Sequence, residues 1–181
     1  MAVDDAVTAL GVVVERMDFP YRKAGRRAPD RAPVLLRSVE EEAAALAERS
    51  GLPGSGLWLG GRSMGGRICS MAVAEGLPSR GLVLISYPLH PPGRPDRRRV
   101  EHFPSLALPC LFVSGTRDAF GTRAELEAAT SAIPGPVTHQ WVEGRDHGMR
   151  RADAEVAALV AGWISARLGE PVGLTVSGPR D

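Results

Sequence analysis

The sequence predicts an α/β protein, a three-layer α/β/α sandwich with a mostly parallel sheet. Two runs, GLVLIS (residues 81–86) and PCLFVSG (residues 109–115), are continuously apolar, as is typical of strands buried on both faces. Along the chain these runs alternate with segments whose apolar residues recur at helical spacing. Strands that alternate with helices form parallel sheets covered by helices on both faces, joined by right-handed crossovers.

Length and composition predict one domain over residues 1–168, followed by a C-terminal tail over residues 169–181. A chain of 181 residues with 44% hydrophobic content can bury a core without disulfides or metals. The 22 Lys and Arg against 21 Asp and Glu leave a formal charge of +1, which gives no overall attraction to nucleic acid or anionic membrane. Cys69 and Cys110 lie in apolar stretches, as expected of free thiols in a reducing compartment. Without a basic leader or a long apolar run, we expect a soluble, cytoplasmic protein.

Two helices and one strand are expected before the first glycine-rich turn. Residues 2–10 fit a short helix, and GVVVERMDF (residues 11–19) is a β-branched run of strand length. A basic, Pro/Gly-rich loop follows over residues 21–33. Ser38, with Glu41 three residues later, has the pattern of a capping box, so we expect the next helix to begin there and to include the Ala-rich segment.

The remaining elements alternate between strand and helix as far as the tail. The exception is the proline-rich segment 88–109, which is expected to be an irregular surface excursion and is too short for a lid domain. In order, the predicted elements are a short strand at 57–60, a helix at 64–75, a strand at 81–86, a strand at 109–115, a helix at 123–132, a strand at 137–144 and a final helix at 152–168.

Residues 61–65 spell G-x-S-x-G between a predicted strand and a predicted helix. At such a nucleophile elbow, a sharp turn holds the serine Oγ above the carboxyl edge of the sheet. Glycines beside the serine avoid collisions with the strained backbone or the neighbouring strand. The pattern favours Ser63 as a nucleophile, although a tight turn that merely contains a serine fits the same five residues.

A serine hydroxyl is a weak nucleophile, so it needs a base and a third group that orients the base. Asp118 lies three residues past the predicted strand that ends at Gly115, and His147 lies between the last strand and the last helix. Both positions are at the edge that carries Ser63. Asp146 is a rival for the acid, but sequence neighbours seldom present their side chains to each other, so we prefer Asp118.

The other three histidines are weaker candidates for the base. His90 and His102 fall in the proline-rich excursion and are expected to be solvated, although His90 fits the mouth of a pocket as a weak substrate-binding residue. His139 lies within the last strand and is expected to be structural. No grouping of His, Cys, Asp and Glu has metal-ligand spacing, so we expect neither a metal nor another cofactor.

Arg62 and Arg67 flank the serine. An arginine beside a helix N-terminus opposes the helix dipole, which indicates a paired carboxylate or an anionic substrate group. An ion pair within the protein, or simple exposure, explains the same residues. The basic stretches at residues 22–31 and 97–99 are expected to be solvated loops, since no aromatic residues interleave with them to bind nucleic acid.

Five segments together resemble a small lidless branch of the α/β-hydrolase superfamily, the dienelactone-hydrolase-like "predicted hydrolases". This branch is similar to testis-expressed and histone-acetyltransferase-complex-subunit proteins of animals. The segments are FPYRKAGRRAPDRAP, GGRSMGGR, YPLHPPG, SGTRDAFGT and GRDHGM, and the resemblance covers about residues 10–168. It implies that Ser63 is the nucleophile, Asp118 the acid and His147 the base, with the Met64 N–H as one donor of the oxyanion hole. The resemblance does not fix a substrate, and some similar proteins act as binding subunits. The triad itself predicts a cofactor-free enzyme that cleaves an ester, thioester or related acyl bond of a small molecule.

The chain departs from this family at its N-terminus, where the family has further strands and a His-Gly-x-Gly loop with a second oxyanion donor. GVVVERMDF resembles the family's fourth strand, so the strand between it and LWLGG is missing. We expect the two flanking strands to pair directly or to accept another chain, and Met1 to be an internal methionine of a longer protein. A stop codon immediately before Met1 would contradict that expectation.

Loss of one oxyanion donor lowers turnover by about 10²- to 10³-fold. Three functions therefore stay open at the level of sequence. They are a serine hydrolase, an acyltransferase with the same triad, and a weak or inactive hydrolase-like module that serves as a protein-binding subunit.

Overall fold

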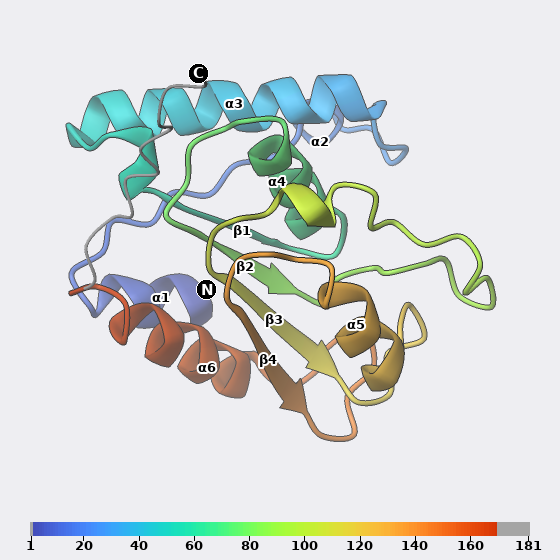
Figure 1. Cartoon of the computed structure of the whole chain (residues 1–181). Coiled ribbons are helices and arrows are strands. Elements are labelled where there is room, and N and C mark those ends of the chain that lie inside the picture. The colour runs from blue at the N-terminus through green and yellow to red at the C-terminus, as the bar shows by residue number, and fades with distance from the viewer. Residues whose placement is uncertain (1, 170–181) are drawn as a thin grey trace, which may run out of the picture.

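The structure is a computed structural model that describes residues 2–169. These residues form a four-stranded parallel sheet with helices on both faces (Figure 1). The strands lie side by side in chain order: β1 (Trp58–Arg62), β2 (Gly81–Ile85), β3 (Cys110–Gly115) and β4 (Val137–Val142). The predicted α/β class is confirmed, and the carboxyl ends of all four strands lie at one edge.

The helices form the two outer layers. One face is covered by α4 (Met64–Ala74) and α5 (Arg123–Thr130), with α3 (Ala32–Ser50) packed on the outside of α4. The other face is covered by α6 (Asp153–Ser165) and by α1 (Ala2–Thr8), which lies against it. Shorter turns are α2 (Pro20–Lys23), η1 (Gly54–Gly56) and, within the proline-rich excursion, η2 (Phe103–Ser105).

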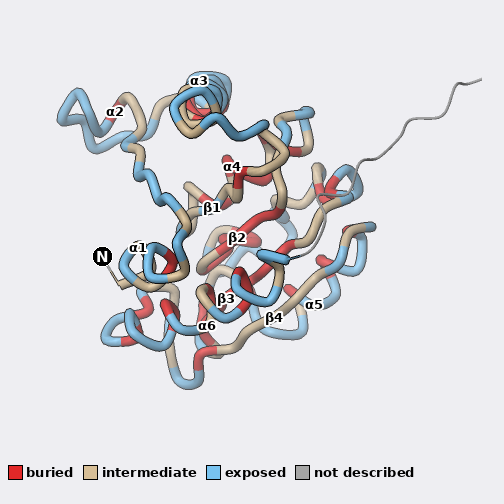
Figure 2. The backbone as a smooth tube through the Cα atoms, turned by 90° about the vertical axis from the view of Figure 1, so that its left-hand side faces the viewer, coloured by how far each residue is buried: buried red, intermediate tan, exposed pale blue. Residues whose placement is uncertain are grey.

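The central strands are apolar on both sides because each face meets a helical layer. In β3, Cys110 and Phe112 join the core beneath α4 and α5, whereas Leu111 and Val113 join the core beneath α6. All four are fully buried. Figure 2 shows the same pattern along the backbone, with β2 and β3 mostly buried, β1 and β4 mostly intermediate, and many exposed residues on the outer helices.

Two predictions for the N-terminal region are wrong. Residues 12–19, the predicted strand, have no regular secondary structure. Helix α3 begins at Ala32, ahead of Ser38, because Pro33 in its first turn has a backbone angle that suits a helix start. Ser38 is buried inside the helix, where its hydroxyl donates to the Leu35 carbonyl.

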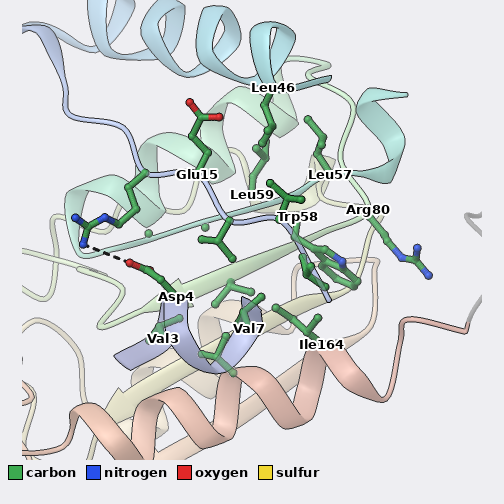
Figure 3. A pocket seen from close by; sticks show the side chains of 18 of the residues that line it. Val3, Asp4, Val7, Glu15, Leu46, Leu57, Trp58, Leu59, Arg80 and Ile164 are labelled. Atoms are coloured by element: carbon green, nitrogen blue, oxygen red, sulfur yellow. Dashed lines mark ion pairs between the residues drawn. The ribbon is translucent and has the colours of Figure 1, made fainter. Parts of the chain in front are cut away.

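Strand β1 is an edge of the sheet, and its outer side faces an apolar cavity of about 1130 Å³. Figure 3 shows this cavity between β1 and the segment that contains Glu15, with Val3 and Val7 of α1 and Ile164 of α6 below. The segment does not pair with β1, so the first of the two expected alternatives, direct pairing across the gap, is wrong. The second alternative, pairing with another chain, stays a prediction.

Side-chain contacts hold this segment away from the strand. Glu15 bonds to Arg49 of α3 at 2.6 Å, and Arg16 pairs with Asp4 of α1 at 3.3 Å. These two neighbouring residues thus link the segment to α3 on one side and to α1 on the other, and the segment lines the cavity opposite β1. Within residues 2–169, no helix has the length and apolar character needed to cross a membrane.

Candidate active site

Ser63 occupies a strained turn between β1 and α4. Its φ is 52°, in the left-handed region that residues other than glycine rarely adopt. The Ser63 N–H donates to the Ile85 carbonyl at 2.8 Å, which fastens the turn to the end of β2. This is the geometry of a nucleophile elbow, with the serine at the carboxyl edge of the sheet.

Two glycines make the turn possible, and they are not both members of the G-x-S-x-G pattern. A Cβ on Gly61 would lie 2.7 Å from the backbone of Gly65 and Gly66, and a Cβ on Gly66 would lie 2.6 Å from the Gly61 carbonyl oxygen. A Cβ on Gly65 would meet nothing within 4 Å. The close approach of strand and helix therefore requires Gly61 and Gly66, while Gly65 is sterically free.

The three residues predicted as a triad lie together. His147 Nε2 is 2.8 Å from Ser63 Oγ, and His147 Nδ1 lies 3.0 and 2.9 Å from the two carboxylate oxygens of Asp118. The Asp118 side chain is only 2% exposed, whereas the His147 side chain is 22% exposed. The carboxylate is thus shielded from water while the imidazole remains accessible from the surface.

Comparison with known proteins identifies the family of the chain. The model of a family described as the alpha/beta hydrolase domain matches residues 1–163. The chain belongs to this family. Among solved structures, this hydrolase domain is similar to the esterase domain of a Rhodothermus marinus protein, with a TM-score of 0.68, 17% identity, and coverage of 91% of this chain and 78% of that one.

Two further structures resemble this hydrolase domain over a smaller share of their length. One is an alpha-beta serine hydrolase homologue from Coxiella burnetii, with a TM-score of 0.63, 17% identity, and coverage of 77% of this chain and 62% of that one. The other is dienelactone hydrolase from Anabaena variabilis, with a TM-score of 0.59, 18% identity, and coverage of 75% and 60%. The chain thus spans less than two thirds of these two proteins.

Phe120 and Arg62 hold His147 in place in the hydrolase domain. Their contacts with His147 and its loop were not predicted from the sequence. The Phe120 ring stacks on the imidazole, with centroids 4.0 Å apart and 27° between the planes, and the Phe120 N–H donates to Asp118 Oδ1 at 2.8 Å. Arg62 donates to the carbonyl oxygens of His147, at 3.2 Å, and of Gly148. The only sequence signal for Phe120 was an aromatic residue two positions after the acid.

Asp146, the rival candidate for the acid, does not bond to the imidazole of His147. Asp146 Oδ1 accepts the Gly148 N–H at 2.9 Å, so this carboxylate shapes the loop that carries His147. His147 itself is bonded to Asp118. The preference for Asp118 as the partner of the histidine matches the geometry.

The Met64 N–H, at the first position of α4, has no acceptor among residues 2–169. It lies directly after Ser63, at the positive end of the helix dipole. The group is therefore available to an external oxygen atom beside the serine.

The remaining histidines are all tied into the fold. His90 is only 5% exposed, bonds to the Pro91 carbonyl and lies 3.5 Å from Glu125, so its predicted solvation is wrong. His102 is half-buried and bonds to Ser70 at 2.8 Å, so its predicted solvation is also wrong. His139 is structural, as predicted, since its Nε2 lies 2.9 Å from the Thr130 hydroxyl.

Neither cysteine competes with Ser63 as a nucleophile. Cys69 and Cys110 are free and buried, as predicted. Burial raises the pKa of both thiols to about 12, so the reactive thiolate is scarce at neutral pH.

Proposed function

We propose that the protein is a serine hydrolase that cleaves an ester, thioester or related acyl bond of a small molecule through an acyl-enzyme. The observation that carries this proposal is the hydrogen-bonded chain from Ser63 through His147 to Asp118. Membership of the alpha/beta hydrolase family supports it. We also retain the expectation of a cytoplasmic location, which suits two free thiols.

In the first half of the reaction, Ser63 Oγ attacks the carbonyl carbon while His147 Nε2 takes the hydroxyl proton. Asp118 accepts the Nδ1–H bond, which fixes the tautomer that leaves Nε2 free to accept, and stabilises the imidazolium that forms. The carbonyl oxygen gains negative charge and takes a hydrogen bond from the Met64 N–H. The tetrahedral intermediate then collapses, and the leaving group departs with the proton from His147.

In the second half, water attacks the acyl group on Ser63. His147 now removes a proton from the water and then returns it to Ser63 Oγ as the acid product leaves. Both halves need the imidazole in the same orientation. Phe120 and Arg62 maintain that orientation from the ring face and from the backbone of the loop.

The predicted substrate-binding roles of Arg62 and His90 remain predictions. The Arg62 guanidinium is engaged by the carbonyls of the histidine loop, and His90 is nearly covered. We therefore propose Arg62 first as a positioning residue.

A second candidate function is a protein-binding module with weak or no catalysis. The observation that favours it is the open edge of β1, which faces an apolar cavity of about 1130 Å³. Unpaired strand edges are common sites for pairing with another polypeptide. This function uses a different part of the molecule from the serine.

Labelling with a fluorophosphonate probe separates the two candidates. The hydrolase predicts one label per chain on Ser63, absent in Ser63→Ala and strongly reduced in His147→Ala. Asp146→Asn is a matched control in the same loop and is expected to label like the natural sequence. A folded protein that never labels would overturn the hydrolase and leave the binding module.

A further inference from the structure

A second, smaller cavity of about 260 Å³ lies behind the catalytic loops, at the carboxyl ends of β3 and β4. It is lined by Arg117, Gly144, Arg145, Asp146 and Arg150. Arg117 follows β3 in the loop that carries Asp118, and the other four belong to the loop that carries His147. The cavity therefore lies between the two loops that position the acid and the base.

Backbone bonds hold these two loops together at the cavity. The Arg117 N–H donates to the Arg145 carbonyl at 2.9 Å, and the Gly144 N–H donates to the Thr116 hydroxyl at 2.9 Å. The Arg145 carbonyl also lies so close to Gly115 that no Cβ could fit between them. The cavity walls are thus fixed by the fold and do not depend on a ligand.

The side chains of the three arginines at this cavity have no partner within the described part of the chain; Arg117 and Arg150 are exposed, and Arg145 is partly buried. Across residues 2–169, no hydrogen bond or ion pair engages the guanidinium groups of Arg117, Arg145 and Arg150. The Nε of Arg145 is buried and has no acceptor. Asp146 supplies the one carboxylate of the lining, and its Oδ1 is occupied by the Gly148 N–H.

A buried donor without an acceptor is costly, and such groups in folded proteins usually mark a missing partner. Arg117, Arg145 and Arg150 all line this small cavity, and the repulsion between their like charges would be offset by a bound anion. Guanidinium forks match the oxygen atoms of a phosphate group, to which they donate paired, charge-assisted hydrogen bonds. Three cations against one carboxylate suit a ligand that carries two negative charges.

We propose that this pocket, here called the arginine pocket, binds a phosphate group through Arg117, Arg145 and Arg150. The group is either free inorganic phosphate or the head of a small phosphate monoester, since a cavity of about 260 Å³ has room for a phosphate group. A bound phosphate would add a further link between the Asp118 loop and the His147 loop, which are already joined by backbone bonds. The site is separate from Ser63, so it stands or falls independently of the proposed hydrolase activity.

Calorimetric titration of the full chain at low ionic strength tests the site with inorganic phosphate and, in a second arm, with glycerol phosphate. Arg117→Gln, Arg145→Gln and Arg150→Gln are each expected to raise the dissociation constant about ten-fold or more, as expected when a charge-assisted hydrogen bond is removed. Arg151→Gln is the matched control, because Arg151 has the same charge in the same loop but does not line the pocket. Circular dichroism checks that each variant is folded, and three separate variants guard against one that is not.

Each result of the titration either supports or overturns the phosphate site. Binding that weakens in the three pocket variants and stays within about two-fold in Arg151→Gln supports the site. Tighter binding of glycerol phosphate identifies a monoester as the ligand, and tighter binding of inorganic phosphate identifies the free ion. No binding, equal binding by every variant, or equal weakening in Arg151→Gln would overturn the proposal, the last because it would reflect net charge alone.

Discussion

His147 is held from three directions at once. Its two ring nitrogens bond to Ser63 and Asp118, its ring face stacks on Phe120, and its backbone carbonyl accepts a bond from Arg62. A general base must stay within hydrogen-bond reach of the proton that it removes. The surroundings of His147 supply that restraint on each side.

Replacement of the acid is expected to impair catalysis without unfolding the chain. Asp118→Asn presents an amide to Nδ1, which favours the wrong imidazole tautomer, so turnover of 4-nitrophenyl acetate should fall by about 10³- to 10⁴-fold. Asp146→Asn, in the neighbouring loop, should change turnover little. Equal losses in the two variants would contradict the assignment of Asp118.

Removal of the Arg62 side-chain bonds is expected to loosen the histidine loop. Arg62→Gln should lower kcat by about 10- to 100-fold, as a small misplacement of a catalytic group does, with little change in KM. Arg62→Lys should recover part of the loss, because it keeps a donor. Arg123→Gln, which breaks an exposed ion pair with Glu127, controls for lost charge. A raised KM with unchanged kcat would instead indicate substrate binding by Arg62.

His102 is expected to make stability depend on pH. Burial, aided by the charge of Arg67, lowers the pKa of His102 to about 4 from 6.5. Between these values the unfolded chain binds a proton that the folded chain does not, so stability falls as the pH drops from 6.5 towards 4. The loss of melting temperature between pH 7 and pH 5 should be smaller in His102→Gln by at least about 2 °C, the effect of about 1 kcal/mol in a domain of this size. An unchanged loss would show that His102 does not titrate in this way.

The sequence allowed the three central residues of the site to be predicted because each lies just after a segment that is predicted to be a strand. Ser63, Asp118 and His147 come after β1, β3 and β4, whose carboxyl ends must meet at one edge. The burial of His90 and His102 could not be predicted. It depends on how the proline-rich excursion folds back onto α4 and α5, which no local pattern encodes.

At the scale of elements, the contact between β1 and α4 sets the elbow. Gly61→Ala and Gly66→Ala should each destabilise the fold by at least about 2 kcal/mol, because the new methyl group would overlap backbone atoms. Gly65→Ala should leave stability unchanged or raise it by up to about 1 kcal/mol, since alanine favours a helix and the space is open. Chemical denaturation measures all three, and similar effects at the three glycines would contradict the packing described here.

Strands could be predicted from the sequence where a continuous apolar run is buried between the two helical layers. The predicted strands at 81–86 and 109–115 correspond to β2 and β3, which are buried on both faces. GVVVERMDF has strand composition too, but a strand needs a neighbour, and the segment lies across a cavity from β1. The capping-box pattern at Ser38 failed because Pro33, five residues earlier, suits a helix start and places that start at Ala32.

At the scale of the whole molecule, the sheet is covered by helices on both faces and has two edge strands among residues 2–169, β1 and β4, of which β1 lies beside the apolar cavity. Alternate residues of β1 bond to β2, as the Ser63 N–H does to Ile85, so the N–H groups of Trp58, Gly60 and Arg62 point outward. Among residues 2–169, none of these three groups has an acceptor. One side of the molecule therefore presents an unpaired strand beside an apolar cavity.

Hydrogen exchange should show this asymmetry. The amides of Trp58, Gly60 and Arg62 are expected to exchange at least about 100-fold faster than those of Leu111 and Val113, since unpaired groups exchange without any opening of the sheet. Amide-resolved NMR measures both sets in one sample. Equal protection would mean that a further segment pairs with β1 in solution.

The most direct measurement of the central claim is the acylation of Ser63 itself. Rapid mixing with 4-nitrophenyl acetate, followed by acid quench and mass spectrometry, should give a burst of one nitrophenolate per chain and one acetyl group on the peptide that contains Ser63. His147→Ala should show neither. Acetyl groups confined to lysines or to the N-terminus, with no burst and no modified Ser63, would contradict the claim that this serine, its histidine and its aspartate form an acyl-transfer site.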